Sequence, residues 1–186
     1  MLIVIEGDNG TGKDTLAKRF EESGFHVVTW DSQAKEKEAW ARTFSGLACT
    51  NAFLDYTKLC EDVSVRYKNS LIIRSWISTL SAAYADEKFS LSETMVRAEK
   101  LFQERVSPDF IFFLKCDFEK RIARINARNP NSSDDRTLVR AERYEEISEK
   151  FEKMLLNWHT IDTTGKTPES EFQEAWNFIK LRSENK

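Results

Sequence analysis

A glycine-rich run, Gly-Asp-Asn-Gly-Thr-Gly-Lys-Asp-Thr, fills residues 7–15 and narrows the range of folds more than any other part of the sequence. It follows the phosphate-loop pattern of Gly, four residues and Gly-Lys, except that Asp14 stands where the pattern has Ser or Thr. The apolar residues 2–5 before it predict a strand buried on both faces, and apolar positions at helical spacing follow it. A strand, this loop and a helix in that order predict a phosphate-binding site. The alternative is a glycine-rich turn with an exposed lysine.

The chemistry of such a loop is anion binding. Glycines let the backbone turn so that successive N–H groups point at phosphate oxygens, and the N-terminus of the following helix adds a favourable field. Lys13 supplies a positive charge for the β- and γ-phosphates. The predicted ATP-binding residues are therefore Gly7, Asp8, Asn9, Gly10, Thr11, Gly12, Lys13, Asp14 and Thr15.

The departure at Asp14 bears on the metal, because the missing hydroxyl is the group that ligates Mg²⁺ in phosphate loops. Either Asp14 contributes a carboxylate to the metal, directly or through water, or Thr15 takes this role and Asp14 only caps the helix. A carboxylate close to phosphates repels them unless a cation lies between. We therefore expect Mg²⁺ to matter more here than usual.

Beyond the loop, apolar runs alternate with helical patterns, and further strands are predicted at residues 26–30, 71–73, 109–116 and 158–162. Residues 34–67 predict two helices broken near residues 49–51, and Ser90 and Glu93 form a capping box for a helix that runs to about residue 106. Strands separated by helices favour an α/β fold, a parallel sheet with helices on both faces. The length of 186 residues predicts one domain over residues 1–186.

Arginines flank a polar loop at residues 129–135 in two stripes of helical spacing: Arg121, Arg124 and Arg128 before it, and Arg136, Arg140 and Arg143 after it. This arrangement is typical of a lid over phosphates, where cations neutralise the charge that develops in phosphoryl transfer. The alternative is a pair of solvated helix faces that pair with nearby glutamates.

Arg74 follows the strand at residues 71–73 at its carboxyl end, where ligands bind in parallel α/β sheets. We predict that Arg74 contacts a ligand, with a structural ion pair as the alternative. Most tryptophans have the spacing of core residues, but Trp30 or Trp76 is a candidate to stack on a ligand base.

Charge and cysteine usage exclude several classes. The net charge of −3 gives no basic field for nucleic acid or an anionic membrane, and no apolar run approaches the roughly 20 residues of a membrane helix. Cys49, Cys60 and Cys116 form no CxxC pair, and two histidines are too few for an imidazole metal site. We expect a cytoplasmic protein with reduced thiols, no disulfide and no zinc.

Together these residues resemble the thymidylate kinase family of nucleoside monophosphate kinases over most of the chain. Residues 5–13 are similar to its Glu-Gly-x-Asp-Gly-x-Gly-Lys segment, and Arg74 with Ser78 is similar to its Asp-Arg-x-x-x-Ser segment. Residues 107–110 look like the Pro-Asp that leads into the fourth strand, and residues 121–136 fall where the family has its lid.

The resemblance implies a P-loop NTPase-type three-layer fold, with a five-stranded parallel sheet and a small lid at about residues 126–137. It implies transfer of the ATP γ-phosphoryl group to a nucleoside monophosphate, dTMP first in line, with Mg²⁺ and in a homodimer. Carried over by position, Lys13, Arg74, Arg128 and Arg136 would be catalytic, and Asn9, Arg74 and Ser78 would bind the acceptor.

Several positions depart from the family pattern. Asn9 stands where the family has a loop carboxylate, Ile73 replaces the Asp before the strand-end Arg, and Trp-Asp-Ser at residues 30–32 replaces Arg-Glu-Pro. These changes leave ATP binding intact but weaken the case for thymidylate. Two alternatives therefore stay open: a kinase for a deoxynucleoside or another small acceptor, and a nucleotide-binding protein that has lost transfer activity.

Overall fold

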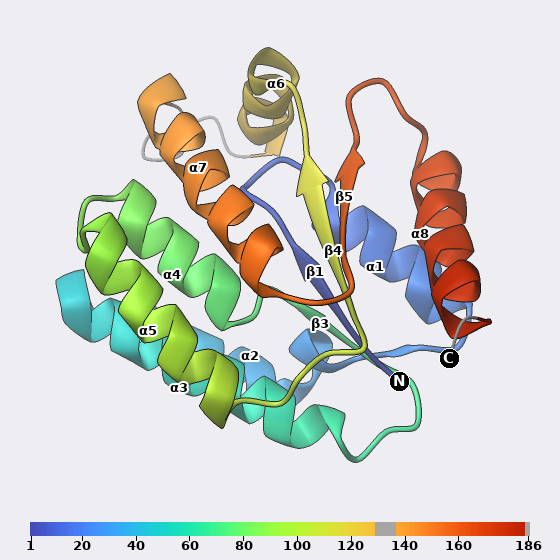
Figure 1. The fold of residues 1–186 in the computed structure, drawn as a ribbon, viewed down its shortest axis with the longest axis horizontal. Coiled ribbons are helices and arrows are strands. Elements are labelled where there is room, and N and C mark those ends of the chain that lie inside the picture. The colour runs from blue at the N-terminus through green and yellow to red at the C-terminus, as the bar shows by residue number, and fades with distance from the viewer. Residues whose placement is uncertain (129–136, 185–186) are drawn as a thin grey trace.

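Every residue of β1 (Leu2–Glu6) is buried, because β1 lies at the centre of a five-stranded parallel sheet of order β2-β3-β1-β4-β5 (Figure 1). The structure is a computed structural model that describes residues 1–128 and 137–184. The other strands are β2 (His26–Val27), β3 (Ser70–Ile73), β4 (Phe110–Lys115) and β5 (Trp158–Asp162). The expected five-stranded parallel sheet is confirmed.

The register of the strands brings their carboxyl ends to one edge of the sheet. Ile5 pairs with Ile73 on β3 and with Phe112 on β4. Because the strands are parallel, the loop after β1, Arg74 after β3 and the segment after β4 all open at this edge. The ligand-binding end of the sheet is therefore set by strand pairing.

Helices cover both faces of the sheet in three layers. The helices are α1 (Lys13–Glu22), α2 (Ser32–Ala41), α3 (Gly46–Ser64), α4 (Trp76–Ala85), α5 (Leu91–Glu104), α6 (Phe118–Arg128), α7 (Leu138–Met154) and α8 (Pro168–Ser183). Figure 1 shows α1 and α8 on one side of the strands and α3, α4, α5 and α7 on the other.

Two apolar clusters hold these layers together, one on each face. Side chains alternate along β1, so Ile3 and Ile5 pack in the cluster with Phe20 of α1, and Val4 packs in the cluster with Leu80 of α4. Burying each such side chain contributes about 1.5–3 kcal/mol. The α/β architecture follows from the uninterrupted apolar strands, which need cover on both faces.

Two predicted boundaries are wrong. Residues 49–51 lie inside α3, and the break falls instead between Ala41 and Gly46; Thr50 is buried, so packing outweighs its low helix propensity. The strand predicted at residues 26–30 pairs only at His26–Val27, after which Val28–Trp30 forms a 3₁₀ turn. Val28 is fully buried, so its apolar character reflects the core rather than strand pairing.

Capping residues predicted helix ends more reliably than apolar patterns predicted these two boundaries. Ser90 and Glu93 form the expected capping box at the start of α5, which ends at Glu104, and Thr167 caps α8 ahead of Pro168. The helix of the first arginine stripe continues through Arg128. Arg136 and the expected lid loop at residues 129–135 lie outside the described residues.

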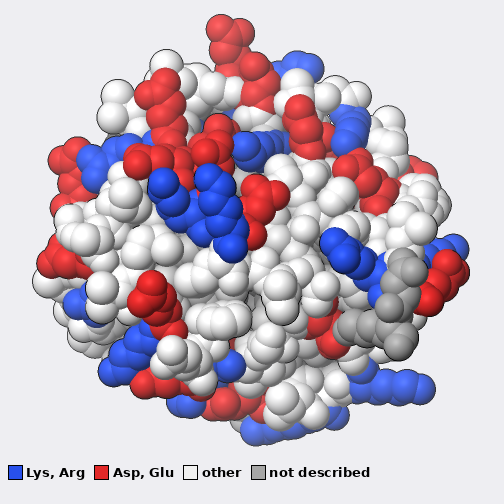
Figure 2. All heavy atoms as spheres, in the orientation of Figure 1, with Lys and Arg blue, Asp and Glu red and all other residues white. Residues whose placement is uncertain are grey.

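The surface carries both signs of charge. On the face in Figure 2, acidic and basic side chains are interspersed rather than gathered in one large area of a single sign. Within residues 1–128 and 137–184, no helix combines the length and the apolar character needed to cross a membrane.

Candidate active site

The loop between β1 and α1 is shaped by glycines with positive φ. Gly7 has φ 133°, and a Cβ there would lie 2.5 Å from the carbonyl oxygen of Leu114, so no other residue fits. Gly12 has φ 98° at the N-cap of α1, where no side chain caps the helix. The first N–H groups of a helix have no intrahelical partners, which makes this uncapped end a site for an anion.

Lys13 lies inside this loop and is buried. Its Nζ donates to the carbonyl oxygen of Asp8 at 2.6 Å, and the Thr11 hydroxyl donates to the same oxygen at 2.8 Å. Burial lowers the pKa of Lys13 well below its ordinary value, and the nearby charge of Arg74 acts in the same direction. An anion in the loop would favour the charged form of Lys13, so phosphate binding and Lys13 protonation reinforce each other.

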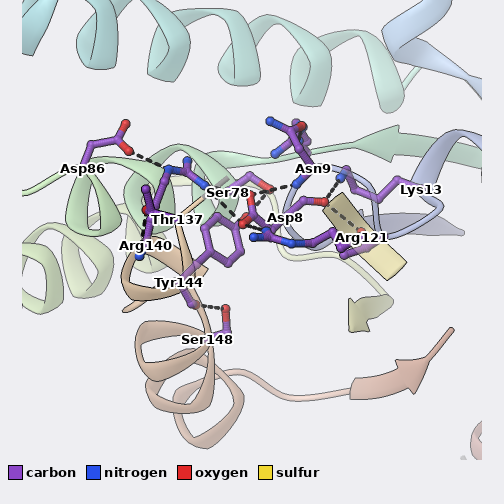
Figure 3. A network of polar contacts seen from close by, with 12 residues as sticks. Asp8, Asn9, Lys13, Ser78, Asp86, Arg121, Thr137, Arg140, Tyr144 and Ser148 are labelled. Carbon is purple, nitrogen blue, oxygen red and sulfur yellow. Dashed lines mark hydrogen bonds and ion pairs between the residues drawn. The ribbon is translucent and has the colours of Figure 1, made fainter. Parts of the chain in front are cut away.

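The carboxylate of Asp8 contacts two helices that lie more than 100 residues further along the chain (Figure 3). It accepts from Arg121 of α6, and from Arg140 of α7 at 3.0 Å. Burial opposes ionisation of Asp8, but the charges of Arg140 and Arg121 outweigh burial and hold its pKa below the ordinary value. Asp8 is therefore an ionised acceptor that fastens α6 and α7 to the loop.

Arg140 also connects α7 with the end of α4. Its Nε donates to Asp86 at 2.7 Å while its Nη1 contacts Asp8, and Arg143 pairs with Glu87. The Tyr84 hydroxyl donates to Glu146 at 2.6 Å. Arg140 and Arg143 thus pair with acidic residues just after α4, which corrects the view of solvated helix faces for these two arginines.

Arg74 adopts a left-handed backbone conformation with φ 68°, uncommon for a residue with a side chain. Its backbone N–H donates to the Ile5 carbonyl at 3.0 Å, and its guanidinium donates to Oδ1 of Asn9. The side chain of Arg74 therefore lies against the phosphate loop. The backbone conformation sets the direction in which the side chain leaves the chain, and the contact with Asn9 holds its guanidinium.

Glu6, the last residue of β1, is fully buried and binds the segment at the start of α4. Its carboxylate accepts from the backbone N–H of Ser75 at 2.8 Å, from the Ser75 hydroxyl at 2.5 Å and from the Ser78 hydroxyl. The Tyr144 hydroxyl donates to Ser78 at 3.3 Å. Burial raises the pKa of Glu6 against the effect of these hydrogen bonds. Glu6 thus clamps the start of α4 to the end of β1.

The phosphate loop lies in the middle of a cleft of about 860 Å³. One end is lined by α2, α3 and α4 and includes Trp30, Arg42, Phe53, Tyr56, Arg74 and Ala82. The other end lies between α6 and the start of α8 and includes Arg124, Arg128, Lys166, Pro168 and Glu171. The cleft can therefore hold one ligand on each side of the loop.

The residues predicted to hold a metal ion, Asp14 and Thr15, are exposed and line the cleft. Asp14 lies 3.9 Å from Arg128. Among the described residues no three acidic, His or Cys side chains cluster to hold a metal. One or two protein oxygens suit Mg²⁺, which takes its remaining ligands from water and substrate phosphates.

The structure brings most of the predicted site residues into one cleft, but it changes two interpretations. Arg121 is buried in an ion pair with Asp8 rather than lying free over phosphates, and Trp76 is buried in the core edge-on to Phe151. Trp30 lines the cleft. Sequence reasoning missed the role of Glu6 and the position of Glu171 in the cleft; the acidic residue that ends the apolar strand run was the available signal for Glu6.

An uncapped helix N-terminus behind a glycine loop, at the carboxyl edge of a 2-3-1-4-5 parallel sheet, defines a P-loop kinase-like protein. The sequence profile of the thymidylate kinase family matches residues 61–174. The chain belongs to this family. No curated protein matches the chain by sequence.

Solved structures share the fold at low sequence identity. A deoxyadenosine kinase from M. mycoides with bound dATP matches with a TM-score of 0.69 at 14% identity, over 97% of this chain and 100% of that chain. Thymidylate kinase from Candida albicans matches with a TM-score of 0.66 at 16% identity, over 100% of this chain and 93% of that chain. At these identities the likeness concerns the fold alone.

Proposed function

We propose that this protein is a nucleoside monophosphate kinase that transfers the γ-phosphoryl group of ATP to a nucleoside or deoxynucleoside monophosphate, with dTMP the first candidate. The observation that carries the proposal is the cleft that continues on both sides of the phosphate loop. Such a cleft suits two nucleotides whose phosphates meet over Lys13. Family membership supports phosphoryl transfer.

The residues of the loop would hold the donor. The N–H groups at the start of α1 and the Lys13 ammonium would bind the ATP phosphates, with Gly7, Gly10 and Gly12 keeping the backbone out of their way. Asp14 or Thr15 would hold Mg²⁺, which when bound neutralises charge on the phosphate oxygens. The carboxylate of Asp14 then faces a cation instead of the phosphates.

Arg74 would hold the acceptor phosphate in line with the transferring group. Asn9 supports its guanidinium, and Ser78 lines the same end of the cleft although its hydroxyl donates to Glu6. Arg128 borders the cleft, and with Arg136 it would neutralise the charge that develops in transfer. Catalysis by positioning and charge needs no covalent nucleophile on the protein.

The proposal includes one kinase domain over residues 1–186, a lid at about residues 126–137 and a homodimer. A cytoplasmic location, expected from the free cysteines, stays a prediction. The lid and the homodimer follow from the family resemblance, and the single domain follows from the chain length.

A deoxynucleoside acceptor is the second candidate. Trp30, rather than an arginine, lines the cleft after β2, so the cation that the family pattern supplies at that position is missing. A free hydroxyl would need a general base. The acceptor end is lined by two carboxylates, those of Glu38 and Asp86, and these already contact Arg42 and Arg140.

The test is a coupled assay of ADP release from MgATP with a panel of ribo- and deoxynucleoside monophosphates and the matching free nucleosides. We expect turnover with one or a few monophosphates. Turnover with nucleosides only would favour the second candidate. ATP binding without turnover on any acceptor would favour a nucleotide-binding protein that has lost transfer activity.

A further inference from the structure

The end of the cleft opposite Arg74 contains a buried acid that the phosphate chemistry does not use. Because α2, α3 and α4 line the acceptor end, the sugar and base of the donor must extend the other way, between α6 and the start of α8. Glu171, in the first turn of α8, lines this end. The residue is only 4% exposed.

The carboxylate of Glu171 faces the beginning of α1. Its Oε2 lies 3.8 Å from the position that a Cβ on Gly12 would take, and an Nη1 of Arg124 lies 4.0 Å from the same point. Arg124 donates instead to the Gly10 carbonyl at 3.3 Å and to the Thr163 hydroxyl at 3.2 Å. Within residues 1–128 and 137–184, no group donates a hydrogen bond to the Glu171 carboxylate. Its carboxylate oxygens can therefore accept hydrogen bonds from a ligand in the cleft.

We propose that Glu171 accepts a hydrogen bond from the nucleoside part of the phosphoryl donor and so helps to select which nucleoside triphosphate is used. A carboxylate can only accept hydrogen bonds, so the ligand must present an N–H or O–H group. Adenosine offers two such groups, the exocyclic amino group of the base and the hydroxyls of the sugar. This inference rests on the proposed function, because it assumes that the donor lies over the phosphate loop.

The protonation state suits an acceptor. Burial raises the pKa of Glu171 to about 6, against the opposing charge of Arg124. The carboxylate is therefore mostly ionised at pH 7. Hydrogen bonds to an ionised acceptor are about twice as strong as those between neutral groups.

A purely structural role makes a different prediction. An acid in the first turn of a helix stabilises that helix through the dipole, by about 0.3–1 kcal/mol at exposed sites. Loss of such an acid lowers the stability of α8 but does not change the preference among nucleotides. Nucleotide preference is therefore the quantity to measure.

The experiment measures the dissociation constants of Mg²⁺ complexes of ATP, dATP and ITP by calorimetry for the wild type, Glu171→Ala and Glu171→Gln. ITP replaces the 6-amino group with an oxygen, and dATP lacks the 2′-hydroxyl. Glu169→Ala is the matched control, because Glu169 lies in the same turn of α8 but its side chain is 68% exposed. Far-UV circular dichroism checks that each variant is folded, and Glu171→Gln keeps the side-chain volume if the alanine variant is not.

We expect Glu171→Ala to weaken ATP binding roughly tenfold or more and Glu169→Ala to leave it unchanged. If the amino group is the donor, the wild type prefers ATP to ITP, Glu171→Ala loses this preference, and Glu171→Gln, which keeps a neutral acceptor oxygen, retains only part of it. If the sugar hydroxyl is the donor, the preference for ATP over dATP is instead lost in Glu171→Ala and reduced in Glu171→Gln. Unchanged ratios among the three nucleotides in a folded Glu171 variant would overturn the inference. Absence of nucleotide binding by the wild type would instead overturn the proposed function.

Discussion

At the scale of residues, the site brings basic side chains together beside the phosphate loop. Burial disfavours the charged form of Lys13, and Arg74 lies close enough to disfavour it further. Asp8 is already committed to Arg121 and Arg140. Phosphates that bind in the loop would lie close to Lys13 and Arg74. Positive charge concentrated in a cleft in this way raises the affinity for polyanions.

Asp14 provides a prediction about metal dependence. Its exposed carboxylate lies beside the start of α1, where phosphates would bind, so it repels them unless Mg²⁺ lies between. We expect chelation of Mg²⁺ to weaken ATP binding, and Asp14→Asn to reduce that dependence. Dissociation constants measured with Mg²⁺ and with EDTA check this, with Glu22→Gln at the far end of α1 as the control. Equal affinities for the wild type under both conditions would contradict it.

The loop and Arg74 could be located from sequence because both are local features of a strand end. Glu6 could not be assigned its role, since its partners Ser75 and Ser78 are 69 and 72 residues away along the chain. Arg121 was misread for a similar reason. Helical spacing shows which residues share a face, but not that Asp8, 113 residues distant, would bury one of them.

At the scale of elements, a buried ion pair joins α3 to the end of α5. Arg105 donates to Glu61 at 3.3 Å and to the Leu54 carbonyl at 2.8 Å. Burial raises the pKa of Glu61 to about 7 even though the charge of Arg105 lowers it. The contact therefore costs desolvation that pairing does not fully recover.

This shift predicts a pH dependence of stability. The pKa of Glu61 is about 7 in the folded state and near 4.5 in the unfolded state, so the folded state holds the proton more tightly. Protonated Glu61 therefore contributes stability that is complete below pH 4.5 and is lost as the pH rises to about 7. The free energy of unfolding of the wild type relative to Glu61→Gln should fall over that window, by at most about 1.4 kcal/mol per pH unit. Urea unfolding at several pH values measures it.

The exposed Glu104→Gln, on the last turn of α5, serves as the control and should show no such trend. A difference between wild type and Glu61→Gln that stays constant or grows with pH would count against a raised pKa of Glu61.

A helix end can be predicted from sequence when the residues that cap it are close together in the chain. The capping box of α5 involves only Ser90 and Glu93, so its pattern was sufficient to place the start of that helix. The break between α2 and α3 was misplaced, because Thr50 packs in the core and tertiary contacts override propensity. The predicted length of β2 was too great. A buried valine such as Val28 is expected both in a paired strand and in a core turn, so the sequence does not distinguish the two.

At the scale of the whole molecule, the sheet places the proposed donor site beside the proposed acceptor site. Parallel pairing of β1 with β3 places the phosphate loop beside Arg74, and the cleft extends in both directions from that point. The order of strands and helices was sufficient to predict this architecture, because alternating apolar strands and helices have few other packings. The proposed acceptor end of the cleft is lined by side chains from α2, α3 and α4 that no local pattern brings together.

The most direct test of the account is the split of Michaelis constants in Arg74→Gln. Glutamine keeps a non-glycine side chain in the left-handed conformation but removes the cation. With the best acceptor from the assay panel, we expect the KM of that acceptor to rise about tenfold or more, while the KM of ATP stays within about twofold. An equal rise in both constants, or no change in either, would contradict the assignment of the Arg74 end of the cleft to the acceptor.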